Sequence, residues 1–142
     1  MINLLAIDHV VFRVKDMEAM IAFYEKVLGA RVEKRQEEFG LIQLRAGEAL
    51  IDLLDCDGEL GRMGGAAPGD EGHNVDHICL RVQPWDGEAI RAHLAQHGVE
   101  AGAIASRYGA EGYGPSLYFQ DPEGNTIELK GPPWPPERPE TG

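Results

Sequence analysis

The chain repeats itself: residues 7–14 read Ile-Asp-His-Val-Val-Phe-Arg-Val, and residues 75–82 read Val-Asp-His-Ile-Cys-Leu-Arg-Val. Four residues of the first stretch recur at the same offset in the second, namely Asp8, His9, Arg13 and Val14. Each stretch is followed by a helical pattern that ends at a glycine. Because the similarity persists across a strand and a helix, we interpret the chain as two copies of one structural unit.

Each copy carries the signals of a helix after its first strand. Asp16 and Asp86 are candidate N-caps, because a short acidic side chain accepts hydrogen bonds from the first amides of a helix. Gly29 and Gly98 fit the helix ends, where a left-handed residue is common. The apolar positions between cap and glycine have the spacing of one buried helix face. They are Met17, Met20, Ile21, Tyr24, Val27 and Leu28 in the first copy, and Ala89, Ile90 and Leu94 in the second.

Short apolar runs separated by turn residues follow each helix. They predict strands at 31–35, 40–45 and 49–54 in the first half, and at 101–106, 116–120 and 126–130 in the second. Each half is therefore predicted to be β-α-β-β-β, in a single domain (1–142) with modules at 4–57 and 73–131. The glycine-rich stretch 58–72 is expected to be an exposed connection or a mobile lid. The proline-rich tail, 132–142, is expected to be extended, with Trp134 either packed, on the domain or on a partner subunit, or part of a disordered terminus.

Composition excludes several classes of function. The 142 residues are 43% hydrophobic and 26% charged, which is typical of a soluble globular protein. Thirteen Lys and Arg against 24 Asp and Glu give a net charge of −11, which disfavours nucleic acids and anionic membranes as partners. The two cysteines, Cys56 and Cys79, form neither a disulfide framework nor a zinc motif. With no signal peptide or membrane span in the sequence, we expect a cytoplasmic protein.

Alternation along the strands places a histidine and a carboxylate of each half on corresponding faces. His9 and His77 lie on the first strands, and Asp52 and Glu128 lie on the last strands. If the halves pair about a pseudo-twofold axis, two imidazoles and one or two carboxylates suit a divalent first-row metal and leave positions for water and substrate. The simpler alternative is that the histidines satisfy backbone groups and the carboxylates face solvent.

The repeated Asp-His-x3-Arg-Val and the run from Phe119 to Leu129 resemble the vicinal oxygen chelate superfamily. That run reads Phe-Gln-Asp-Pro-Glu-Gly-Asn-Thr-Ile-Glu-Leu, and the resemblance covers residues 4–131. The superfamily includes glyoxalase I, fosfomycin-resistance proteins, methylmalonyl-CoA epimerase, extradiol dioxygenases and bleomycin-resistance proteins. The resemblance implies an α+β fold in which two tandem βαβββ modules form a half-open barrel. It also implies a small-molecule substrate, one divalent metal ion (Zn, Ni, Mn or Fe) and a homodimer.

Taken position by position, the resemblance places metal ligands at His9, Asp52, His77 and Glu128. Asp52 stands where the family usually has a longer Glu or Gln, so its carboxylate reaches roughly 1.5 Å less far. In glyoxalase-type chemistry, Glu128 or Asp52 is the catalytic base that moves a proton between adjacent carbons of the substrate.

Four residues are expected to contact substrate. Arg13 matches a position that contacts the glutathione carboxylate in glyoxalase I, a task that suits a guanidinium. An ion pair between Arg13 and an acid inside the barrel is the alternative. Arg107 and Tyr113 belong to a glycine-jointed segment, 107–114, that is expected to be a loop, either closing over an oxygenated ligand or simply solvated. Tyr118 lies on the strand that follows.

The leading hypothesis is a divalent-metal-dependent lyase or isomerase of the glyoxalase type, acting on a small substrate that chelates through adjacent oxygens. Two alternatives stay open. Two histidines and one carboxylate also form the facial triad of Fe(II) enzymes, which favours an extradiol-type dioxygenase. The third hypothesis is a metal-free binding protein of the bleomycin-resistance kind.

Overall fold

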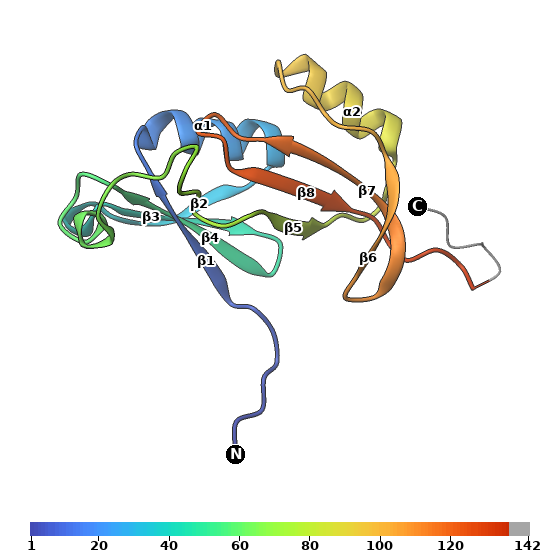
Figure 1. Ribbon diagram of the computed structural model, residues 1–142, viewed down its shortest axis with the longest axis horizontal. Helices are drawn as coiled ribbons and strands as arrows, with labels where there is room; N and C mark the ends of the chain where they lie inside the picture. The colour runs from blue at the N-terminus through green and yellow to red at the C-terminus, as the bar shows by residue number, and fades with distance from the viewer. Residues whose placement is uncertain (137–142) are drawn as a thin grey trace. The chain divides into compact units, whose positions relative to one another are not determined.

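The computed structural model describes residues 1–136 and divides the chain into two compact units, Met1–Asn74 and Val75–Gly142 (Figure 1). Each unit has one helix and one four-stranded sheet, in the order β-α-β-β-β. The predicted α+β fold of two tandem βαβββ modules is therefore confirmed. Each sheet is open, with two edge strands, and neither closes on itself. Within residues 1–136, the helices are too short or too polar to cross a membrane.

The first module is built on the sheet β1-β4-β3-β2. Its elements are β1 (His9–Val14), α1 (Met17–Leu28), β2 (Arg31–Gln36), the 3-10 turn η1 (Glu37–Phe39), β3 (Leu41–Ala46) and β4 (Ala49–Asp55). β1 pairs in parallel with β4, and the other pairs are antiparallel. This register places Asp52 opposite Val11, on the same face as His9.

Helix α1 has the ends that the sequence predicts. The Asp16 carboxylate accepts a hydrogen bond from the amide of Ala19 at 3.1 Å, and Gly29 ends the helix with φ of 71°. The central apolar positions are buried, whereas Met17 and Leu28 are only partly covered. In the second helix, Asp86 likewise caps the amide of Ala89, and Gly98 has a left-handed φ of 72°.

The second module repeats the same topology with the sheet β5-β8-β7-β6. Its elements are β5 (Ile78–Arg81), α2 (Gly87–Gln96), β6 (Ala105–Gly109), β7 (Gly112–Gln120) and β8 (Thr126–Lys130). Cys79 pairs with Glu128 between β5 and β8, and Tyr118 pairs with Glu128 between β7 and β8. Glu128 therefore lies between a cysteine and a tyrosine on one face of the sheet.

Four details of the second module differ from the sequence prediction. The strand predicted at 101–106 lies instead at Ala105–Gly109, as β6. The segment expected to be a loop at 107–114 is a β-hairpin, because Tyr108 pairs with Tyr113 and Gly112, at φ of 110°, permits the tight turn. Gly109 and Gly112 flank the two-residue turn as the last strand pair, and Gly114 lies within β7, so none of them belongs to flexible chain. The strand expected at 75–82 forms only over Ile78–Arg81. Ala89, which was predicted to be buried, is exposed. Leu94 is the buried residue of α2, because only a narrow row of side chains on this short helix is covered.

Both sheets have one apolar and one polar face. The buried apolar strand residues are Phe12, Val14, Ile42, Leu44, Ile51 and Leu53 in the first module, and Leu117, Phe119, Ile127 and Leu129 in the second. The opposite face of the second sheet, here called the second polar face, carries Cys79, Arg81, Arg107, Ser116, Tyr118, Glu128 and Lys130. Polar residues thus alternate with apolar core residues along the strands. One face of each sheet packs in the core and stabilises the module, and the other face carries the polar side chains.

Arg13 attaches the glycine-rich stretch to the first module. Its guanidinium donates hydrogen bonds to four backbone carbonyls at 2.6–3.2 Å, those of Gly61, Gly64, Gly65 and Ala66. Three of these residues lie in or next to the 3-10 turn η2 (Gly61–Gly64). A side chain with this many main-chain acceptors fixes the path of an otherwise largely exposed segment.

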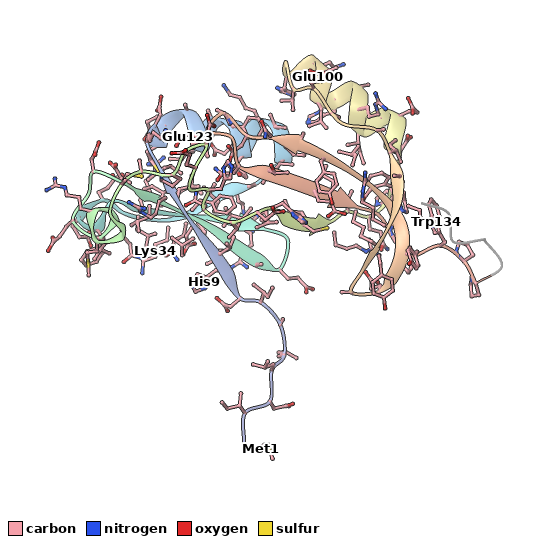
Figure 2. The ribbon with its side chains drawn as sticks, in the orientation of Figure 1. Met1, His9, Lys34, Glu100, Glu123 and Trp134 are labelled. Carbon is pink, nitrogen blue, oxygen red and sulfur yellow. The ribbon has the colours of Figure 1, made fainter. Side chains whose placement is uncertain are left out.

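The start of the tail lies against the second module. Trp134 donates from its backbone amide to the carbonyl of Tyr113, and from its indole Nε1 to the hydroxyl of Ser106, both at 2.8 Å (Figure 2). Of the two interpretations of Trp134, packing on the protein is therefore correct. The rest of the predicted tail, 137–142, lies outside the described residues.

Candidate metal and substrate site

The histidine of the first module is oriented by its neighbour in sequence. His9 begins β1, where the N-terminal segment leaves the sheet (Figure 2). Its Nδ1 lies 2.7 Å from Oδ1 of Asp8. This hydrogen bond, and then the negative charge of Asp52, raise the pKa of His9 above its usual value.

Asp52 presents a buried carboxylate with one unsatisfied oxygen. The residue is 2% exposed, and its Oδ2 accepts a hydrogen bond from Nε2 of Gln43 at 3.2 Å. Within residues 1–136, its Oδ1 has no hydrogen-bond partner. A buried carboxylate oxygen without a donor is costly, so this atom is suited to a bound cation or to a proton.

The second module repeats this pairing with more contacts. Nδ1 of His77 lies 2.6 Å from Oδ2 of Asp76, and its Nε2 lies 3.4 Å from Oε1 of Glu128. Glu128 is 6% exposed, and its register partners on the neighbouring strands are Cys79 and Tyr118. Burial, followed by the Glu128 charge, raises the pKa of Tyr118, so this hydroxyl remains a donor at neutral pH.

Asp8 and Asp76 have a role that the sequence analysis did not assign. Each carboxylate binds Nδ1 of the histidine that follows it, which leaves Nε2 of the ring available. Metal-binding histidines usually have such a partner on the second ring nitrogen. The signal was already present in the sequence, because these aspartates are part of the repeat.

The structure brings Arg107 and Tyr118 together and places Tyr113 elsewhere. The Arg107 guanidinium lies 4.7 Å from the centre of the Tyr118 ring, and donates to the carbonyl and hydroxyl of Ser116 at 2.8 Å. The Tyr118 ring also meets His77 edge to face, with centroids 5.5 Å apart. Tyr113 is an odd number of residues from Tyr118 along β7, so it projects from the opposite face, where its ring contacts Tyr108.

The second module thus gathers a histidine, a buried carboxylate, a tyrosine and an arginine, whereas the first offers His9 and Asp52. Arg13 shares their face, but its guanidinium is occupied by main-chain carbonyls. Within residues 1–136, no three His, Cys, Asp or Glu side chains form a metal-holding group. Each module by itself therefore supplies two candidate ligands, of the nitrogen and oxygen types that divalent first-row metals accept.

A family model confirms the resemblance seen in the repeat. The model, described as the Glyoxalase/Bleomycin resistance protein/Dioxygenase superfamily, matches residues 6–129. The chain belongs to this superfamily. The match includes both modules and all four candidate ligands.

Similar proteins include members of this superfamily with known structures or functions. The metallothiol transferase FosB of Bacillus licheniformis is 28% identical over 128 residues, which are 89% of this chain and 75% of that protein. A protein from the mobile metagenome of V. pseudocholerae is 27% identical with a TM-score of 0.77, covering 92% of this chain and 97% of that one. A virulence protein from Salmonella typhimurium is 26% identical with a TM-score of 0.76, covering 92% and 99%.

Replacing Asp8 with asparagine should lower the pKa of His9 in the metal-free protein. The variant removes the negative charge and leaves a weaker, neutral acceptor for the imidazolium, so the pKa should fall towards the usual value of about 6.5. An NMR titration of the His9 ring protons measures the change. Asp76→Asn is the matched control and should leave the His9 titration unchanged; an unaltered pKa in Asp8→Asn contradicts the assignment.

Cys79 should react slowly with alkylating reagents. Burial, and then the Glu128 charge, raise the pKa of its thiol to about 11, although Lys130 opposes this. At pH 8 the thiolate is scarce, so alkylation by iodoacetamide should be about 100-fold slower than for a small free thiol. Mass spectrometry of the alkylated wild type measures the alkylation rate. The Cys79→Ser variant is measured in the same way and gives the contribution of the buried Cys56. A rate equal to that of a free thiol contradicts this environment.

Proposed function

We propose that this superfamily member is a divalent-metal-dependent enzyme that acts on a small substrate chelating the metal through adjacent oxygens. The observation that carries the proposal is the repeated pairing of an oriented imidazole with a buried carboxylate. His9 accompanies Asp52 in one module, and His77 accompanies Glu128 in the other. Buried carboxylates of a purely structural kind usually have all their oxygens satisfied, whereas Oδ1 of Asp52 lacks a donor within residues 1–136.

In this proposal His9, Asp52, His77 and Glu128 hold the metal. A bound divalent cation would act as a Lewis acid towards the substrate oxygens. Asp8 and Asp76 keep the imidazole rings in the orientation that leaves Nε2 available. Tyr118 and Cys79 flank Glu128 on the neighbouring strands and enclose its carboxylate.

The two carboxylates are the candidate bases for proton transfer. Glu128 has the imidazole of His77 and the side chains of Cys79 and Tyr118 as neighbours, a setting that suits a fixed ligand. Asp52 keeps one oxygen without a donor and is therefore better placed to accept a proton from the substrate. Asp52→Asn should abolish turnover and lower the metal affinity less than Glu128→Gln, which should lose both.

Two reaction classes are compatible with this arrangement. Proton transfer between adjacent carbons makes the protein a lyase or isomerase of the glyoxalase type. The 28% identity to a metallothiol transferase favours a second candidate, addition of a thiol to an electrophilic substrate. Formation of lactoylglutathione from methylglyoxal and glutathione tests the first reaction, and loss of free thiol in the presence of an electrophile tests the second.

The metal content of the full chain purified without chelator tests the proposal. We expect at least one divalent ion for each pair formed by a His9 and a His77. Bound Zn, Ni or Mn would support a lyase or a transferase. Bound Fe(II) with oxygen consumption in the presence of a catechol would support the dioxygenase alternative. A protein that contains no metal and takes up none from Zn²⁺, Ni²⁺, Mn²⁺ or Fe²⁺ would contradict the enzyme proposals and support the metal-free binding protein.

A further inference from the structure

Two exposed histidines lie one turn apart at the C-terminal end of α2, and neither belongs to the candidate metal and substrate site. His93 is in the last turn of the helix and His97 is its C-cap. Residues four apart on a helix lie on the same face, and these two imidazole rings have centroids 4.8 Å apart with planes inclined at 60°. Leu94 supplies the buried contact of α2, so the packing of the module does not account for the pairing of the two rings.

The separation of the two rings fits the coordination of one metal ion. A metal–imidazole bond is about 2.0–2.1 Å long, and the ring centre lies about 1.2 Å behind the bound nitrogen. Two imidazoles in neighbouring positions on one ion, at about 90–110° to each other, therefore have centroids about 4.5–5.4 Å apart. The separation of 4.8 Å between His93 and His97 lies within this range. The same spacing of four residues places two histidines on one ion in helical metal motifs.

The C-terminal end of α2 is electrostatically suited to a cation. The last carbonyls of a helix give this end a partial negative charge. Glu100 follows shortly after the helix and adds a carboxylate at the same end (Figure 2). The helix positions three and four residues from His93 carry no Lys or Arg, because they are Ala89, Ile90, Gln96 and His97. A divalent ion bound to the two rings is therefore attracted by its surroundings.

We propose that His93 and His97 form a copper(II) site on the surface of the second module, separate from the candidate metal and substrate site. The affinity of nitrogen and oxygen ligands for divalent first-row metals reaches its maximum at Cu²⁺. In its tetragonal geometry, Cu²⁺ accepts two neighbouring imidazoles, and water fills the remaining positions. Zn²⁺ sites in proteins, by contrast, have three or four protein ligands, so this pair is expected to leave the Zn²⁺ affinity of the chain unchanged.

A Cu²⁺ titration of the full chain carrying His9→Ala and His77→Ala tests the inference, because this background lacks the imidazoles of the candidate site. Pulsed electron paramagnetic resonance counts the imidazoles bound to each Cu²⁺. We expect one Cu²⁺ per chain, coordinated by two imidazoles. His97→Gln in the same background should leave one imidazole and lower the Cu²⁺ affinity at least about tenfold, because the second ring binds as an intramolecular ligand. His93→Gln should have the same effect.

His73→Gln is the matched control, because it replaces the fifth histidine of the chain, in the glycine-rich stretch, and should leave the Cu²⁺ affinity unchanged. All the replaced histidines are exposed except in name only to their neighbours in sequence, so the far-ultraviolet circular dichroism of the variants should match that of the wild type. If the background variant does not fold, the wild-type chain saturated with Zn²⁺ takes its place. Fewer than two imidazoles per Cu²⁺, or equal affinities with and without His97→Gln, would overturn the inference.

Discussion

Replacing His77 or His9 with alanine is expected to lower the affinity of the chain for Zn²⁺ by at least about 100-fold. Each variant removes one of the two proposed imidazole ligands, whereas loss of a group that only orients a ligand commonly costs 10–100-fold. Nε2 of His77 lies 3.4 Å from the buried Glu128 carboxylate, so alanine also removes a partner of this acid. Competition with a chromophoric chelator at pH 7.5 measures the affinity.

Three variants sharpen this prediction. His97→Ala, at the exposed end of α2, should bind Zn²⁺ as the wild type does. Asp76→Asn should give a smaller loss, of about tenfold, because it frees the His77 ring without removing it. If His77→Ala and His97→Ala retain equal affinities, His77 is not a ligand.

The second large effect concerns stability: Asp121→Ala should lower the free energy of unfolding by about 2–4 kcal/mol. Asp121 is 5% exposed and its carboxylate accepts hydrogen bonds from the amides of Glu123 and Asn125 and from the Asn125 side chain, at 2.8–3.0 Å. Alanine leaves these donors without their acceptor in a mostly buried turn. Urea unfolding monitored by circular dichroism measures the change.

The neighbouring Pro122 provides the control for this turn. Its side chain is exposed, so Pro122→Ala should change the free energy of unfolding by less than about 1 kcal/mol. Equal destabilisation by the two variants would contradict the role given to the Asp121 carboxylate. The Asp-Pro-Glu-Gly-Asn segment is thus explained as a structural turn that sets the start of β8, on which Glu128 and Lys130 lie.

Much of the fold was predictable because its signals are local. The repeat around His9 and His77, the caps at Asp16 and Asp86 and the stop at Gly29 each depend on residues near one another in sequence. The hairpin at 107–114 was wrongly predicted as a loop, because glycines mark both flexible chain and tight turns. Only the pairing of Tyr108 with Tyr113, which depends on the rest of the sheet, distinguishes the two.

The candidate site was predictable only in part. Strand alternation predicted that His77 and Glu128 lie on corresponding faces, but it did not place Arg107 or Tyr118 with Glu128, because Arg107 was expected in a loop. It could not reveal that Lys130 is buried or that the Arg13 guanidinium is occupied by distant carbonyls, since both depend on tertiary packing. The same limit applies to Tyr113, whose side of the sheet follows from a strand that the sequence did not predict there.

X-ray absorption spectroscopy of the Zn²⁺-loaded full chain tests the central claim most directly. The proposed ligands His9, His77, Asp52 and Glu128 predict two imidazoles per metal, with the remaining donors being oxygen and none being sulfur. Loss of one imidazole from the spectrum of His77→Ala would follow from the same assignment. A site with fewer than two imidazoles, or with a thiolate ligand from Cys79, would contradict it.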